Sequence, residues 1–268
     1  MTKASPADRG RSYVVQAMER GGRILDLVQC SPTPLSLTEL TASSGLSTST
    51  TFRMLRSLEY IGLVERTADG DRYRLGLRCV ALGQTYLDQV DFRREALPFL
   101  EQLRGRFNET VHLGVLDQNL RVMYLEKVEG GHPIGMMSRV GRSAPSYCTG
   151  LGKVLLATDI GDPVAVLTTQ GRLERKTPNT ICDPDELRSE LATIAERGFS
   201  VDLEEHEVGV RCVAAPVVDS TGRTVAGISI AGPSQRLSKA DLYGDLAQAT
   251  MQAARDISYR LGGGEGRR

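Results

Sequence analysis

The stretch over residues 34–75 constrains this chain most, because two helical patterns are followed there by a hairpin pattern. Residues 35–40 form a short helical pattern with Ser36 as its N-cap, and Gly45 ends it. A second helix opens at Ser47 and has apolar residues at helical spacing, namely Phe52, Leu55 and Leu58. Two helices joined by a glycine-containing turn predict a helix-turn-helix, whose second helix enters the DNA major groove by its N-terminal end.

A hairpin pattern follows the second helix. Residues 62–66 and 72–75 flank a turn at Asp69-Gly70-Asp71, which is typical of a β-hairpin wing beside the reading helix. An ordinary pair of amphipathic helices with solvated Ser, Thr and Arg side chains is the alternative interpretation. If the stretch binds DNA, we expect contacts to bases or phosphates from Ser47, Thr48, Ser49, Thr50, Arg53, Arg56 and Arg72. Arg56 and Arg72 are expected to contact mainly phosphates.

The overall charge gives this interpretation no support of its own. The 268 residues contain 33 basic and 33 acidic side chains, so phosphate contacts must come from local arginine clusters. Five dispersed cysteines without a CxxC pair indicate reduced thiols. The N-terminus does not resemble a secretory signal, and no apolar run approaches the roughly 18 residues that a membrane span needs. We therefore expect a cytoplasmic protein without membrane contact.

The domain organisation follows from where the patterns change. In the first helix, Gly21-Gly22 predict a break or a late start, because each glycine costs about 1 kcal/mol relative to alanine in a helix. A further helical pattern runs from Leu77 to about Val90 and can join two domains. We expect a polar arm at 1–11, a winged helix-turn-helix at 12–76, a linker helix at 77–90, a second domain at 91–262 and a flexible tail at 263–268.

The second domain mixes strands with helices. Turn residues at 117–119 and 219–222 separate neighbouring strand patterns, which favours antiparallel hairpins. The clearest helix begins after the cap Asp183 and ends at Gly198, and a last helix begins with a capping box at Ser238 and runs to Leu261. The expected strands cover residues 110–116, 120–127, 133–138, 199–203, 212–218 and 224–230.

Two of these strands have one face of small side chains. One parity of residues 225–231 is Gly227, Ser229 and Ala231, and one parity of residues 212–217 is Cys212, Ala214 and Pro216. Such a face leaves room for a ligand, and a helix packed closely on it is an equally good interpretation.

A glycine turn over residues 150–152 opens a helical pattern. Its N–H groups are unobstructed by side chains and can hold a carboxylate or a phosphate, although the spacing is not that of a Walker loop.

With these residues in view, the chain resembles the IclR family of bacterial transcriptional regulators over nearly its whole length, from about Gln16 to Leu261. The resemblance rests on several motifs that agree together. They are SRVGRSAP at 138–145, TGLGK at 149–153, GFSVDLEE at 198–205, GVRCVAAPV at 209–217 and SIAGP at 229–233.

The resemblance implies an α+β protein with an N-terminal winged helix-turn-helix, a linker helix, and a GAF-like or profilin-like effector domain. That domain has a curved antiparallel sheet flanked by helices. Members of the family are dimers or dimers of dimers that bind palindromic double-stranded DNA operators and respond to small metabolites, often organic acids. We expect a repressor of a catabolic operon, with an activator as the alternative. The acid would change the arrangement of the domains, and the linker helix would transmit that change.

In the family the ligand lies between the glycine turn and the sheet. This implies that the effector contacts Gly150, Leu151, Asp202, Cys212, Ser229 and Ala231. Ala231 stands where several members have a second pocket serine, so the ligand is expected to differ from theirs.

Single residues would also suit two other classes of function. Cys212 with His112 or His206 would suit a thiol nucleophile, and the Glu204-Glu205 pair would suit acid–base chemistry. Adjacent carboxylates on a strand point opposite ways, however, and no nucleophile–base–orienter motif is present. A metal sensor would use Asp202, Cys212, His132 or His206, which lack the spacing of metal ligands. We expect no catalysis, no cofactor and no metal.

Overall fold

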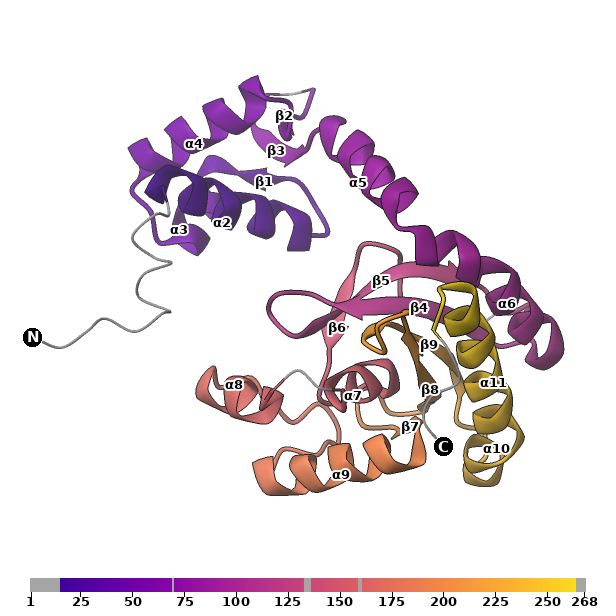
Figure 1. Cartoon of the computed structure of the whole chain (residues 1–268). Coiled ribbons are helices and arrows are strands. Elements are labelled where there is room, and N and C mark those ends of the chain that lie inside the picture. Colours follow the sequence, from indigo (N-terminus) through magenta and orange to yellow (C-terminus); the bar gives the residue numbers. More distant parts are fainter. Residues whose placement is uncertain (1–14, 69, 133–135, 159–160, 264–268) are drawn as a thin grey trace, which may run out of the picture. The chain divides into compact units, whose positions relative to one another are not determined.

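The structure is a computed structural model that describes residues 15–68, 70–132, 136–158 and 161–263. The chain forms two compact units, one ending at Tyr86 and one beginning at Leu87 (Figure 1). The arm expected at residues 1–11 lies outside the described residues, as does the tail expected at 263–268 apart from Gly263. Among the described residues, no helix is both long enough and apolar enough to cross a membrane.

The N-terminal unit is a small helical core closed by an antiparallel sheet. Its buried apolar cluster includes Ile24, Leu40, Leu55 and Tyr73. Within the described residues the strand order is β1-β3-β2, and the β2–β3 hairpin is the predicted wing. The winged helix-turn-helix is therefore confirmed. Its elements are α2 (Gln16–Cys30), β1 (Leu35–Ser36), α3 (Leu37–Ser44), α4 (Thr48–Tyr60), β2 (Val64–Arg66) and β3 (Arg72–Leu75).

Local capping chemistry sets the helix ends as predicted. The Ser36 hydroxyl accepts from the Glu39 N–H, and the Glu39 carboxylate accepts in return from the Ser36 N–H, which completes a capping box. Gly45 ends α3 in the left-handed conformation, with φ at 67°.

Two details of this unit differ from the sequence prediction. Helix α2 runs unbroken through Gly21-Gly22, because Gly21 is buried and faces Leu58 of α4. Tertiary packing thus outweighs the helix cost of the glycine. Phe52 is 43% exposed, and Thr51 takes the buried position in the stripe with Leu55 and Leu58.

The C-terminal unit has a sheet with helices on both faces. Within the described residues the sheet has six strands in the order β6-β5-β4-β9-β8-β7, and neighbouring strands are antiparallel. Helix α5 (Arg78–Gln89) leads into this unit. The further elements are α6 (Asp91–Phe107), β4 (Thr110–Leu116), β5 (Arg121–Val128), β6 (Ser143–Pro145), α7 (Gly150–Leu156), α8 (Pro163–Thr169), α9 (Pro184–Arg197), β7 (Ser200–Leu203), β8 (Val210–Val218), β9 (Thr224–Pro233), α10 (Lys239–Tyr243) and α11 (Asp245–Arg260).

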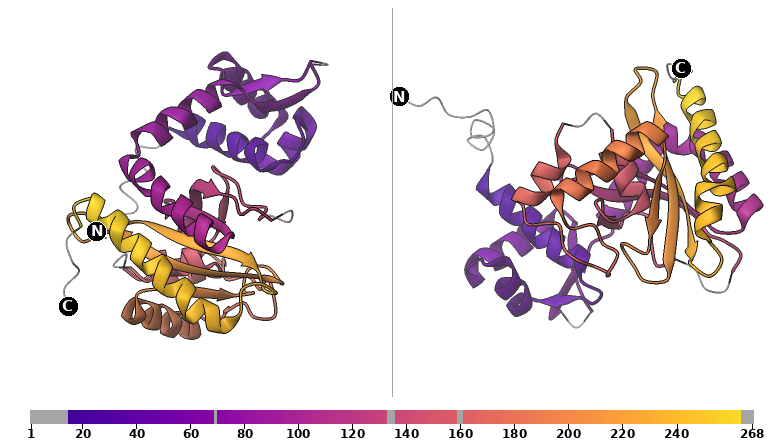
Figure 2. Two further views of the ribbon diagram at one scale, coloured as in Figure 1. Left: turned by 90° about the vertical axis from the view of Figure 1, so that its right-hand side faces the viewer. Right: turned by 90° about the horizontal axis from the view of Figure 1, so that it is seen from below.

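The two faces of the sheet have different coverings. Helices α6 and α11 lie side by side on one face, over a core that includes Val111, Val213, Ile228 and Ile230 (Figure 2). Helix α7 lies on the other face and α9 packs on α7. The fold class expected from the sequence is therefore confirmed.

Two element predictions for this unit are wrong. The strand expected at 133–138 falls partly outside the described residues, and its described part, 136–138, is not a strand. The strand β6 that pairs with β5 instead lies at Ser143–Pro145. The last helix is two helices, because the backbone at Gly244 leaves the helical region between α10 and α11 (φ −106°, ψ −115°).

Candidate DNA-binding and effector sites

The N-terminal tip of α4 presents a cluster of hydroxyl groups. Ser47 Oγ caps the helix by accepting from the Thr50 N–H at 3.3 Å. The hydroxyls of Ser49 and Thr50 lie 3.2 and 2.9 Å from Ser47 Oγ, and Thr48 is exposed beside them. Hydroxyls and free amides at a helix start are suited to phosphate oxygens and base edges. The structure therefore brings together the four polar residues predicted at this tip.

The three predicted arginines differ in how their charges are engaged. Arg56 Nη1 lies 2.8 Å from Glu59 Oε2. Arg72 Nη1 donates to the Pro34 carbonyl at 2.8 Å and lies 3.2 Å from Glu39 Oε2. Arg53 is exposed, and its guanidinium has no hydrogen bond or ion pair to the described part of the chain. Of the three arginines, Arg53 can therefore bind a phosphate without first breaking an ion pair with a carboxylate.

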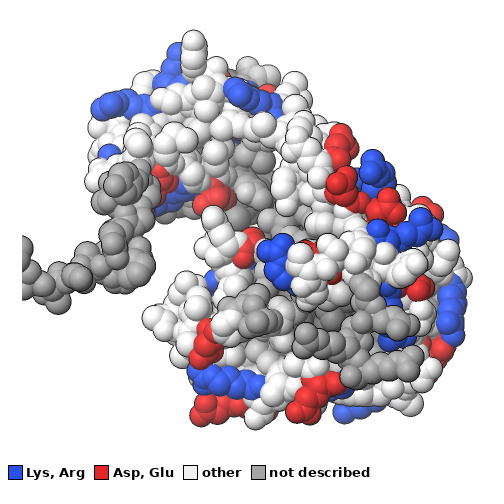
Figure 3. All heavy atoms as spheres, in the orientation of Figure 1, with Lys and Arg blue, Asp and Glu red and all other residues white. Residues whose placement is uncertain are grey.

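The charge around this tip is local. On the face of the N-terminal unit seen in Figure 3, basic side chains are separated by uncharged surface. This agrees with the zero net charge of the chain and with the expectation that individual arginines supply any phosphate contacts.

The effector residues predicted from the sequence meet on the sheet face under α7. The strand register aligns one row of residues, Thr110, Ala231, Cys212 and Asp202, across β4, β9, β8 and β7. The next row is His112, Ser229, Ala214 and Ser200. The Leu151 amide and the Ser229 hydroxyl lie against the Cys212 thiol, and Gly150 is next to Cys212 as well.

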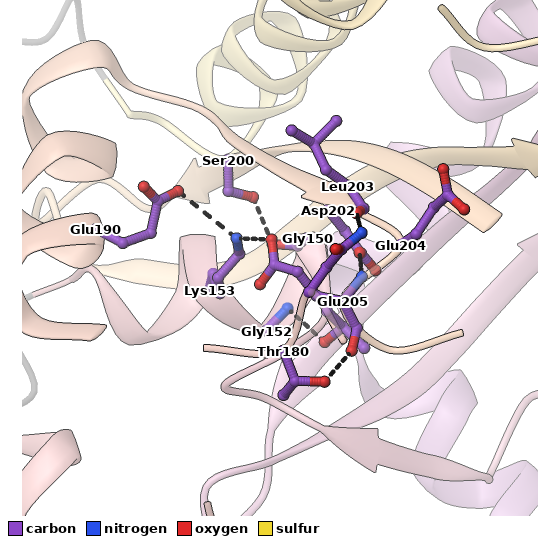
Figure 4. Close-up of polar contacts among 12 residues, drawn as sticks. Gly150, Gly152, Lys153, Thr180, Glu190, Ser200, Asp202, Leu203, Glu204 and Glu205 are labelled. Carbon is purple, nitrogen blue, oxygen red and sulfur yellow. Dashed lines mark hydrogen bonds and ion pairs between the residues drawn. The ribbon is translucent and has the colours of Figure 1, made fainter. Parts of the chain in front are cut away.

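Helix α7 rests directly on the small-residue face. A Cβ added at Gly114 or Gly227 would lie within 2.9 Å of the Leu151 side chain, and one added at Gly150 would lie 2.9 Å from Cys212 Sγ. The Ser200 hydroxyl donates to the Gly150 carbonyl at 2.5 Å (Figure 4). At Gly114 and Gly227 the structure therefore agrees with one of the two interpretations of this face, which is close packing of a helix on small residues.

Lys153 is a buried charge at the site that the sequence prediction missed. Its side chain is 1% exposed, and Nζ lies 2.5 Å from Glu205 Oε1 and 3.6 Å from Glu190 Oε1 (Figure 4). The second Glu205 oxygen is buried without a hydrogen-bond partner among the described residues, and burial raises the pKa of this carboxyl. A lysine inside an otherwise apolar helix was the signal, since a buried ammonium needs a carboxylate partner.

Burial also shifts the other titratable groups here. Burial, followed by the nearby Glu205 carboxylate, raises the pKa of Asp202 to about 7. Burial raises the pKa of both the Cys148 and the Cys212 thiols to about 12. Burial and then Lys127 lower the pKa of His112 to about 3, so this imidazole is neutral at physiological pH.

These shifts bear on the enzyme and metal alternatives. The His206 Nδ1 atom lies 3.8 Å from the Cys148 thiol rather than beside Cys212. Thiols with a pKa near 12 are poor nucleophiles at neutral pH, because the thiolate is the reactive form. No group of three or more His, Cys, Asp or Glu side chains placed to hold a metal ion occurs among the residues that the structure describes.

Two cavities lie in the described C-terminal unit, and neither is lined by the predicted effector residues. One of about 550 Å³ is lined by Leu203, Glu204, Glu205, Arg211 and residues of the 175–181 segment. The other, of about 600 Å³, lies between α7, α9 and the β8–β9 turn. Leu203–Glu205 directly follow Asp202, so the first cavity approaches the polar rows from the side of β7.

A winged helix-turn-helix followed by a sheet domain with a buried polar cluster defines a DNA-binding transcriptional regulator with a separate effector-binding domain. Comparison with known proteins agrees. Residues 17–68 match the IclR helix-turn-helix domain, and residues 84–259 match the model described as bacterial transcriptional regulator IclR C-terminal. The chain belongs to the IclR family of bacterial transcriptional regulators.

Individual relatives match almost end to end. The chain is 35% identical to the HTH-type transcriptional regulator XynR of Escherichia coli (strain K12), over 92% of this chain and 98% of that protein. It is 30% identical to the transcriptional repressor IclR of the same organism, over 98% and 99%. A crystal structure of an IclR homolog complexed with 4-hydroxybenzoate, from Microbacterium hydrocarbonoxydans, matches with a TM-score of 0.76 and 26% identity, covering 91% of this chain and 98% of that one.

Proposed function

We propose that the chain represses transcription by binding a palindromic operator, and that a small organic acid in the C-terminal unit changes its affinity for that operator. The observation that carries the proposal is the convergence of α7 with strands β7, β8 and β9 on one buried polar cluster. Support comes from two similar proteins: one is a transcriptional repressor, and the other is complexed with 4-hydroxybenzoate, an organic acid.

In this proposal the acid contacts the amides of Gly150 and Leu151 together with Asp202, Cys212 and Ser229, beside the methyl group of Ala231. An acid that binds one arrangement of the units more tightly than another shifts the population toward it, and α5 transmits the shift. The chain acts in the cytoplasm, where the operator is, and catalyses no reaction.

The DNA contacts in this proposal come from the tip and outer face of α4 and from the wing. Ser47, Thr48, Ser49, Thr50 and Arg53 meet bases or phosphates, and Arg56 and Arg72 meet phosphates after leaving Glu59 and Glu39. The working unit is a homodimer or a dimer of dimers, because a palindromic operator presents two equivalent half-sites.

The test is the binding of the purified chain to promoter fragments of its own locus, measured by fluorescence anisotropy against random duplex over a range of salt concentrations. We expect Arg53→Ala to weaken specific binding by about tenfold and to lower the salt slope by roughly 1. Arg56→Ala is the matched control and should have a smaller effect, because Glu59 already engages that charge.

The same titrations, repeated with millimolar organic acids, test the effector half of the proposal. An acid effector should shift the operator affinity several-fold, and the sign of the shift distinguishes induction from co-repression. If the chain has no preference for its own promoter over random duplex, with or without acids, the proposed function is wrong.

A further inference from the structure

His112 lies at the centre of the polar rows, although the sequence prediction considered it only as a partner of a thiol. Its neighbours Val111 and Leu113 point into the core under α6 and α11, so the His112 side chain points to the α7 face. The strand register places it directly between Ser229 of β9 and Lys127 of β5. The residue is 3% exposed, so each polar atom of its ring must find a partner inside the protein.

The two ring nitrogens of His112 are held unequally. Nε2 lies 2.7 Å from Ser138 Oγ, which is a close hydrogen bond. Nδ1 lies 3.5 Å from Ser229 Oγ, at the outer limit of hydrogen bonding. The Tyr124 ring packs against the imidazole with centroids 5.0 Å apart and fixes its plane. Nδ1, which faces Ser229, is therefore only weakly hydrogen-bonded, whereas Nε2 has a close hydrogen bond to Ser138.

The charges near His112 limit which ligand group can approach it. The Lys127 ammonium already donates to Met136 O at 2.7 Å and to Glu129 Oε1 at 2.9 Å, so two of its three N–H donors are engaged. Asp202 and Glu205 place two carboxyl groups at the other end of the rows, with Lys153 paired to Glu205. A second ligand carboxylate at the His112 position would meet an uncharged imidazole, which offers it no opposite charge.

A hydroxyl group suits the position between His112 Nδ1 and Ser229 Oγ. It both donates and accepts, so it pairs with the imidazole in either tautomer and with the serine hydroxyl at once. We propose that His112 and Ser229 together read a hydroxyl group of the effector, and that the effector class is therefore small hydroxylated monocarboxylic acids. This inference rests on the proposed function, because it names the acid that the same site takes.

The experiment compares acids that differ only in hydroxylation, by calorimetry on the purified full-length chain. The pairs are 4-hydroxybenzoate with benzoate, lactate with propionate, and gluconate with hexanoate. We expect at least one hydroxylated acid to bind roughly tenfold or more tightly than its partner, because the partner leaves buried polar groups without hydrogen bonds.

Variants of His112 locate the recognition on one edge of the ring. His112→Asn keeps a polar group near the position of Nδ1 and should retain part of the preference. His112→Gln keeps one near Nε2 and His112→Phe keeps neither, and both should bind the two members of a pair equally. Ser138→Ala, which removes only the partner of Nε2, is the control and should keep the preference. Operator binding without acid and the melting temperature establish that each variant is folded.

The possible outcomes separate this inference from the proposed function. If the wild type binds both members of every pair equally, or if the folded Gln variant keeps the wild-type preference, the inference is overturned while acid binding still supports the proposed function. His112→Gln keeps a polar side chain at this position, so it tests the inference even if His112→Phe does not fold. Binding of none of the six acids at millimolar concentration overturns both.

Discussion

At the scale of single residues, the glycines of α7 show how closely this helix is seated. A Cβ at position 152 would lie 2.3 Å from the Ser146 backbone, a distance that no side-chain motion can relieve. At position 150 the nearest atom is the Cys212 sulfur at 2.9 Å, which belongs to the proposed effector site. The two glycines thus serve different needs: Gly152 permits the packing of the helix against the preceding segment, and Gly150 brings its backbone next to the polar rows.

The packing at Gly152 leads to a prediction about stability. Gly152→Ala should destabilise the chain by about 3 kcal/mol or more, since overpacking against backbone forces the helix to shift. Gly105→Ala, in α6 with no atom within 4 Å of the added Cβ, is the matched control and should stabilise by up to about 1 kcal/mol. Urea unfolding of the C-terminal unit measures both changes. A Gly152→Ala variant as stable as the wild type would show that α7 is not seated as described.

The buried Asp202 carboxyl leads to a prediction about pH. Its pKa is about 7 in the folded chain against an ordinary value of 3.8, so between these values the folded state holds a proton that the unfolded state has released. The contribution of Asp202 to stability should therefore fall as the pH rises from about 4 to 7. Asp202→Asn removes this contribution, and its amide oxygen can still accept from the Glu205 N–H, as Asp202 Oδ1 does at 2.7 Å.

The measurement is urea unfolding of the wild type and of Asp202→Asn at pH 5 and pH 7.5. The wild type should lose stability relative to the variant at the higher pH. Glu205 also has a raised pKa, but it is present in both proteins and its contribution largely cancels from the difference. A difference in unfolding free energy that does not change with pH would contradict the raised pKa of Asp202.

At the scale of elements, α5 differs from the other long helices because it has no buried residue. Leu77, Val80 and Tyr86 are 79%, 69% and 54% exposed, although apolar side chains of this size are usually covered in a folded protein. A helix that is apolar and uncovered in one chain is suited to an interface with a second copy. We therefore propose that α5 forms part of the interface of the proposed dimer.

The exposed face of α5 leads to a prediction about assembly. Val80→Asp should weaken self-association by roughly tenfold or more, because a charge buried at an apolar interface is costly. Thr85→Asp, also exposed on α5, adds the same charge without removing an apolar side chain, and it should weaken association less. Sedimentation velocity over a range of protein concentrations reports the change. Equal association of the wild type and Val80→Asp would exclude this part of α5 from the interface.

At the scale of the whole molecule, the proposed regulation joins two separately folded units. The apolar cluster of the first unit includes Ile24 and Leu55, and that of the second includes Val213 and Ile257. Because each unit has its own core, loss of packing in one leaves the other able to fold. Gly152→Ala should therefore affect the acid response more than the intrinsic affinity for DNA.

Much of the molecule was predictable from sequence because it depends on local chemistry. The caps at Ser36 and Asp183, the helix start at Ser47 and the glycine at 198 set helix ends through hydrogen bonds a few residues apart, and all four lie where predicted. Turn residues made the antiparallel hairpins predictable in the same way. The errors at Gly21-Gly22 and at Phe52 arose where packing between helices outweighed local propensity.

The sequence by itself determined the family, the fold class and the residues expected at the two sites, because motifs and caps consist of residues that are close together in the sequence. Only the tertiary structure decided what surrounds those residues. It seats Leu151 on Gly114 and Gly227, pairs Lys153 with Glu205, and leaves Arg53 without a carboxylate partner among the described residues. It also sets His112 beside Ser229, 117 positions away along the chain. Such contacts depend on strand register and helix packing, which join distant parts of the chain.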